Sequence, residues 1–179
     1  MNLQFLVFLK IFYSKFMNTF SSKYNQVFSQ SVSELWSAIS VENNLNDNHP
    51  FCKENRSIEW SVDSHKDILI YLNGMVYVRD FSEWFEGKGY NLWIGQDGGP
   101  KSYVEWRINE HSEGSELSIT VYPHLLSKWT KTLAFLPYWV YIDPKLRSYL
   151  KSVLKGFKWN LDNNTAVPRN QFGKHNWFS

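Results

Sequence analysis

The sequence predicts an α+β fold: a curved antiparallel sheet of six or seven strands wrapped around a long C-terminal helix, with two short helices after the first strand. Three observations support this. Runs of alternating apolar and polar residues fill residues 57–122, as half-buried strands do. Tight turns join these runs, which favours antiparallel pairing of neighbours. One long apolar stripe at helical spacing follows over residues 146–161.

The first strand and the first helix have local sequence signals. Residues 24–30 (YNQVFSQ) alternate as a short strand does. Ser31 and Glu34 then stand at the spacing of a capping box, which favours a helix start. An apolar stripe follows, formed by Val32, Leu35, Trp36 and Ile39. We expect a helix over residues 33–40 and a second helical turn over residues 42–45.

The remaining strands are expected in six runs that lie close together along the chain. These runs are residues 57–62, 67–73, 75–81, 90–95, 101–110 and 116–122. Asn73-Gly74, between the second and third runs, is typical of a type I′ hairpin turn. Each late strand has one apolar face, for example Val104, Trp106 and Ile108, which needs a covering layer.

The C-terminal helix would supply this layer. Asp143-Pro144 is typical of a helix start, with Asp as the cap and Pro at the first helical position. The apolar stripe consists of Leu146, Tyr149, Leu150, Val153, Leu154, Phe157 and Leu161. A helix from about residue 144 to residue 161 would be ~27 Å long, which is enough to cross a sheet.

Composition excludes several classes of function. The net charge is +2, from 19 basic and 17 acidic residues, so we expect no nucleic-acid partner. The single cysteine rules out an internal disulfide and a multi-cysteine zinc site. Gly87-Lys-Gly89 and Gly98-Gly99 lack the spacings of phosphate-binding loops. His49 and Cys52 are too few to make a metal site and are interpreted as structural, so no cofactor or metal is expected.

The N-terminal twenty residues are apolar but do not form a signal peptide. A basic start and a small-residue cleavage site are both absent, and the apolar run over residues 5–9 is too short to span a membrane. This segment is interpreted as an upstream extension before Met17, an interfacial amphipathic helix, or an extra packed helix. We expect a cytoplasmic protein whose fold survives deletion of residues 1–16.

Basic residues concentrate near the C-terminus. Residues 145–179 contain seven basic residues and one acidic residue. A solvated helix face is the simplest explanation, because charge runs on helices usually have that role. A transient contact with an anionic membrane or an acidic partner remains the alternative. The oligomeric state stays open.

Several stretches resemble the SRPBCC superfamily of helix-grip proteins, which includes the steroidogenic-acute-regulatory-type lipid-transfer domains, polyketide cyclase-like proteins and the birch pollen allergen family. The similar stretches are residues 31–39 (SVSELWSAI), 48–51 (NHPF), 104–108 (VEWRI), 113–120 (EGSELSIT) and 146–161. The resemblance implies one ligand-binding domain over residues 21–162, between the extension 1–20 and a tail 163–179. It implies a ligand cavity between sheet and helix, and no shared set of catalytic residues.

The connection over residues 122–143 departs from the family pattern. It carries several aromatic residues, which are Trp129, Phe135, Tyr138, Trp139 and Tyr141. It is interpreted as a lid, a partner surface or additional packing.

The leading hypothesis is a protein that binds or transports a hydrophobic or amphipathic small molecule without catalysis. The residues expected to bury the ligand are Ile58, Trp60, Ile70, Val104, Trp106, Ile119, Leu150, Val153 and Phe157. Tyr77 or Arg79 would orient a polar end, although Arg79 also fits a surface position or a structural ion pair. A cyclase or dehydratase is the first alternative, and it requires several polar residues to meet in one pocket, namely His49, Tyr77, Arg79 or His124. An interaction module built on residues 122–143 is the second.

Overall fold

The computed structural model describes residues 20–125 and 131–179. The expectation about deleting residues 1–16 therefore lies outside the described residues. The described chain contains a seven-stranded antiparallel sheet in the order β1-β7-β6-β5-β4-β3-β2. Its strands are β1 (Ser22–Phe28), β2 (Cys52–Trp60), β3 (His65–Tyr71), β4 (Val76–Phe85), β5 (Gly89–Gly95), β6 (Lys101–His111) and β7 (Gly114–Tyr122). Strands β2 to β7 form a meander, and β1 extends it beside β7, which confirms the predicted sheet.

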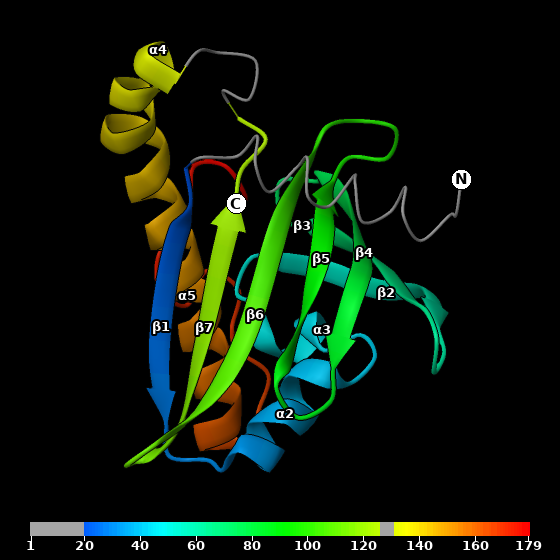
Figure 1. Cartoon of the computed structure of the whole chain (residues 1–179). Coiled ribbons are helices and arrows are strands. Elements are labelled where there is room, and N and C mark those ends of the chain that lie inside the picture. The colour runs from blue at the N-terminus through cyan, green and yellow to red at the C-terminus, as the bar shows by residue number, and fades with distance from the viewer. Residues whose placement is uncertain (1–19, 126–130) are drawn as a thin grey trace, which may run out of the picture.

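Two short helices follow β1, as predicted. Helix α2 (Val32–Ser40) begins with the expected capping box. The backbone N–H of Ser31 donates to Glu34 Oε2 at 2.8 Å, and the backbone N–H of Glu34 donates to Ser31 Oγ at 3.3 Å. Helix α3 (Leu45–Asn48) lies a few residues beyond the expected helical turn. Both helices close the end of the molecule opposite α4, the first part of the C-terminal helix (Figure 1).

The turn between β3 and β4 differs from the predicted type. A type I′ turn needs a positive φ at both central residues, and only Gly74 has one, at 86°. The backbone N–H of Tyr71 instead donates to the carbonyl of Met75 at 2.9 Å, across a three-residue loop. The backbone N–H of Met75 donates to Asn73 Oδ1 at 3.1 Å. The asparagine thus stabilises the loop through its side chain.

The C-terminal helix begins upstream of the predicted start. Helix α4 (Lys131–Pro137), the π-helical turn η1 (Tyr138–Ile142) and helix α5 (Asp143–Asn163) form one continuous helical run. The backbone N–H of Asp143 donates to the carbonyl of Tyr138, a π-type bond that precedes Pro144, which has no N–H to donate. Asp143 is therefore not a helix cap. Its carboxylate accepts hydrogen bonds from Ser22 Oγ at 2.7 Å and Arg147 Nε at 2.8 Å.

Helix α5 covers the concave face of the sheet, as predicted (Figure 1). Its buried side chains include Leu150, Leu154 and Phe157. One close contact fixes the position of α5 against α3: a Cβ atom at Gly156 would lie 2.2 Å from the carbonyl oxygen of Asn48. Only glycine fits at this crossing. No helix within residues 20–125 and 131–179 is both long and apolar enough to cross a bilayer.

Candidate functional site

A pocket of about 750 Å³ lies between the sheet and α5. Strands β3 to β7, α5, residues 123–125 and the C-terminal tail all contribute to its wall. Most of the wall is apolar, and the main apolar side chains are Leu69, Met75, Leu92, Ile94, Val104, Trp106, Ile119, Val121, Leu146, Leu150, Val153 and Phe178. The volume falls in the range of pockets that hold small molecules, roughly 300–1,000 Å³.

Seven of the eleven residues predicted to bury or orient a ligand line this pocket. They are Tyr77, Arg79, Val104, Trp106, Ile119, Leu150 and Val153. Tyr77 and Arg79 share one face of β4 because side chains alternate along a strand. Trp106 and Ile119 are directly paired across β6 and β7. Leu150 and Val153 face them from adjacent positions on α5.

The other four predicted residues, which are Ile58, Trp60, Ile70 and Phe157, lie outside the pocket wall. Ile70 points to the opposite face of β3 from Leu69 and Tyr71, which do line the pocket. Phe157 is fully buried one turn further along α5, against Trp106 at 5.5 Å between ring centroids. Ile58 is 53% exposed on β2.

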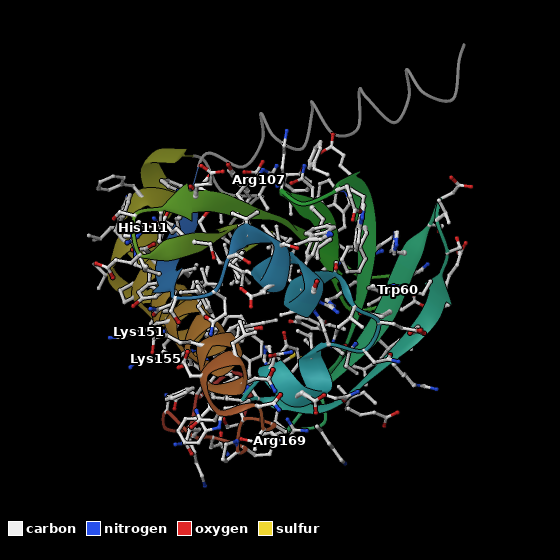
Figure 2. All side chains as sticks on the ribbon, turned by 90° about the horizontal axis from the view of Figure 1, so that it is seen from below. Trp60, Arg107, His111, Lys151, Lys155 and Arg169 are labelled. Atoms are coloured by element: carbon white, nitrogen blue, oxygen red, sulfur yellow. The ribbon has the colours of Figure 1, made fainter. Side chains whose placement is uncertain are left out.

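Trp60 belongs to a separate aromatic cluster. Its ring lies 4.9 Å from that of His65 and 5.5 Å from that of Phe81, measured between centroids. Figure 2 shows it at the end of β2, across the molecule from α5. In the same view, Lys151 and Lys155 point outward from α5, as a solvated basic face predicts. Trp60 therefore lies outside the wall of the pocket between the sheet and α5.

Arg79 is a buried cation, and Asp67 neutralises it. The two side chains are 3% and 0% exposed. Arg79 Nε donates to Asp67 Oδ1 at 2.7 Å, and its Nη2 donates to Asp67 Oδ2. A longer contact of 3.5 Å joins Nη2 to Asn44 Oδ1. Of the alternatives left open for Arg79, the structure shows an internal ion pair, so the pocket gains no uncompensated positive charge from it.

One corner of the pocket is polar, where three side chains from distant parts of the sequence meet. His49 Nε2 lies 2.9 Å from Tyr149 Oη, and Tyr149 Oη lies 3.0 Å from Tyr71 Oη. His49 follows α3, Tyr71 ends β3 and Tyr149 belongs to α5. All three line the pocket, and Tyr77 packs edge-on against Tyr71 with ring centroids 5.4 Å apart.

Burial keeps this corner uncharged. It lowers the pKa of His49 from 6.5 to about 3, with help from the positive charges of Arg79 and Arg169. It also raises the pKa of Tyr71 and of Tyr149 above the usual value for a phenol. At neutral pH the corner therefore presents a neutral imidazole and neutral hydroxyl groups. Such groups can hydrogen-bond a polar atom of a ligand without any ionic attraction.

Cys52, which follows His49 closely in sequence, does not join it in the pocket. The thiol is buried, and it contacts Asn46 Oδ1 at 3.9 Å. Burial raises the pKa of Cys52 to about 12, so the thiolate is not formed at neutral pH. The two residues form no nucleophile pair.

The C-terminal tail forms part of the pocket wall. The ring of Phe178 stacks on Tyr71 at 4.5 Å and packs on Tyr149 at 4.4 Å, between centroids. Asn73 Nδ2 donates to the carbonyl of Trp177 at 2.8 Å, which ties the tail to the β3–β4 loop. The tail has no periodic pattern, so its place in the wall could not be predicted from the sequence; Trp177 and Phe178, near its end, are the residues that could have indicated it.

The rim of the pocket carries exposed apolar residues. Leu125 and Tyr141 line the pocket and are 40% and 56% exposed. Next to Tyr141, the α4–η1 segment also exposes Leu133, Phe135, Leu136, Trp139 and Val140. The polar contacts at the rim include His124, whose Nδ1 lies 3.0 Å from Ser102 Oγ. The connection over residues 122–143 thus contributes to the pocket and also has the exposed apolar surface that an interaction module needs.

Comparison with known proteins gives matches among solved structures. No family model and no curated protein matches the sequence. Ara h 8.0201 is 18% identical, with a TM-score of 0.57 over 80% of this chain and 99% of that one. MLL2253 from Mesorhizobium loti is 13% identical and has a TM-score of 0.57; the match covers 80% of this chain and 97% of that one. DynU16, from the dynemicin biosynthetic locus, is 10% identical and has a TM-score of 0.61; the match covers 82% of this chain and 48% of that one.

At these identities the likeness shows the fold alone. The chain has the helix-grip fold that its sequence predicts, and it spans about half the length of DynU16.

Proposed function

We propose that this helix-grip protein binds and transports a hydrophobic or amphipathic small molecule, lipid-like or polyketide-like, in the pocket between the sheet and α5. The observation that carries the proposal is the pocket itself, about 750 Å³ in volume with a mostly apolar wall. Transfer of apolar surface from water into such a wall is favourable by about 25 cal/mol per Å².

The wall chemistry favours binding over catalysis. His49 Nδ1 accepts a hydrogen bond from the backbone N–H of Phe51 at 3.2 Å, and its Nε2 contacts Tyr149, so neither ring nitrogen is available as a base. Arg79 is held by Asp67. A transported ligand needs only shape, apolar contact and a few oriented polar groups, and the pocket has all three.

A cyclase or dehydratase is the second candidate, and one observation favours it. The four residues whose convergence this reaction requires, namely His49, Tyr77, Arg79 and His124, all line the one pocket. The groups that remain for chemistry are tyrosine hydroxyls, which could polarise a substrate carbonyl. Conversion of a bound polyketide by the purified protein, lost in Tyr77→Phe, would support the enzyme over the carrier.

To test the carrier function, valine is replaced by tryptophan at two positions, one in the pocket wall and one on the surface. Val153 is buried in the pocket wall, and Val62 is 95% exposed in the β2–β3 turn. Native mass spectrometry after incubation with fatty acids, sterols and polycyclic aromatics should detect a one-to-one adduct with the wild type and with Val62→Trp. Val153→Trp should lose it, because the indole fills the pocket. The absence of any adduct across these classes, or equal binding by Val153→Trp, would contradict the proposal.

A further inference from the structure

A backbone hydrogen bond determines which ring nitrogen of His49 carries a hydrogen. The backbone N–H of Phe51 donates to His49 Nδ1 at 3.2 Å, so Nδ1 bears no hydrogen and the ring is neutral. The single ring hydrogen is therefore on Nε2. Since Nε2 lies 2.9 Å from Tyr149 Oη, the imidazole donates to that hydroxyl oxygen.

Counting hydrogens then leaves one donor without an acceptor. Tyr149 and Tyr71 each have one hydroxyl hydrogen, and a single contact of 3.0 Å joins their oxygens. If Tyr149 donates in that contact, the hydroxyl hydrogen of Tyr71 has no acceptor among residues 20–125 and 131–179. If Tyr71 donates instead, the hydroxyl hydrogen of Tyr149 has no acceptor among the same residues. Either assignment gives one unpaired hydroxyl hydrogen at the pocket wall.

Apolar side chains flank the tyrosine pair on the pocket side. Phe178 covers one side of the tyrosine pair, and Met75 and Leu150 belong to the same pocket wall. A hydroxyl donor left unpaired beside apolar groups is unfavourable, and a ligand atom in the pocket is placed to accept from it.

We infer that the ligand carries a neutral hydrogen-bond acceptor, such as a ketone or ester carbonyl oxygen, which accepts from the Tyr71–Tyr149 hydroxyl pair. This inference rests on the proposed function and names the class of ligand. The acceptor is neutral because Arg79, the cation in the described pocket wall, already pairs with Asp67. An anionic head group would be buried there without a counter-charge.

Two probes test this: 9-fluorenone and fluorene, which differ only by a carbonyl in place of a methylene. Quenching of tryptophan fluorescence gives the dissociation constant of each, and the ratio of the two is the preference for the ketone. Changing Tyr71→Phe and Tyr149→Phe together should lower this preference roughly 5- to 10-fold, the effect of one net hydrogen bond. Either single change leaves one unpaired hydroxyl hydrogen and should have a smaller effect.

Tyr77→Phe tests the rival donor, because it removes the hydroxyl of the ring that packs edge-on against Tyr71 and keeps both hydroxyls of the pair. It should change the preference less than twofold, and a loss equal to that of the double variant would assign the donor to Tyr77 and overturn the inference. Binding of both probes with an unchanged ratio in the double variant would also overturn it. Failure of both probes to bind the wild type would overturn the proposed function and this inference together.

Infrared spectroscopy of the wild type keeps the test valid if the double variant does not fold. The carbonyl stretching band of bound 9-fluorenone should lie below its position in an apolar solvent, because a hydroxyl donor weakens the C=O bond. A band at the apolar-solvent position would overturn the inference.

Discussion

The neutral, buried state of His49 predicts a specific loss of stability in acid. In the unfolded chain this imidazole has its ordinary pKa of 6.5, whereas burial lowers the pKa to about 3 in the folded protein. Between these two values the unfolded state binds a proton that the folded state does not. The contribution of His49 is therefore fully present above pH 6.5 and is lost progressively as the pH falls toward 3.

The size of the effect follows from linkage. Each pH unit inside this window lowers the free energy of unfolding by roughly 1.4 kcal/mol for one proton. Going from pH 7 to pH 5, most of which lies inside the window, should cost about 2 kcal/mol from His49 alone. That is a large part of the total stability of an ordinary domain, which is about 5–15 kcal/mol.

The assay compares the wild type with His49→Gln by urea unfolding at pH 7 and pH 5. Glutamine can accept from Phe51 and donate to Tyr149 but does not titrate, so its variant lacks this one linkage. The wild type should lose about 2 kcal/mol more than the variant over this interval. Three other histidines also have lowered pKa values, the partly buried His65 and His124 and the buried His175; they affect both proteins equally and cancel. Equal losses in the two proteins would refute the reasoning.

Three further substitutions test the packing around the pocket. Arg79→Met leaves the buried carboxylate of Asp67 unpaired and should lower the free energy of unfolding by about 3–5 kcal/mol, with Arg79→Met/Asp67→Leu recovering much of it. Phe178→Ala should cost about 3 kcal/mol in urea unfolding, against less than about 0.5 kcal/mol for the exposed Phe135→Ala. Gly156→Ala should reduce the melting temperature, because the new Cβ meets the carbonyl of Asn48. This is expected although alanine is the better helix former by about 1 kcal/mol. An increase in melting temperature would show that α3 can move away.

Local signals predicted the elements well, and the errors have physical causes. The capping box at Ser31 specifies a helix start within four residues, so it could be read from the sequence and is confirmed. Asp143-Pro144 looked like a similar start, but a proline also fits inside a helix where a π-type turn redirects the hydrogen bonds. The pattern alone does not distinguish a helix that begins from one that continues.

The pocket was harder to predict because its wall depends on which face of each strand is inside. Strand β3 is apolar on both faces, so alternation could not decide between Ile70 and its neighbours Leu69 and Tyr71. On β6, where Glu105 and Arg107 mark the outer face, Trp106 was assigned correctly to the inner face. The Tyr71–Tyr149 contact joins residues 78 positions apart, and no local pattern indicates it.

The contribution of the C-terminal tail to the pocket wall also determines when the pocket can be completed during synthesis. All seven strands and α5 leave the ribosome before Phe178 does, since translation runs from the N-terminus. A nascent chain can therefore complete its sheet and its helix while the tyrosine pair still faces water. The wall of the pocket is complete only when Phe178 packs against Tyr71 and Tyr149.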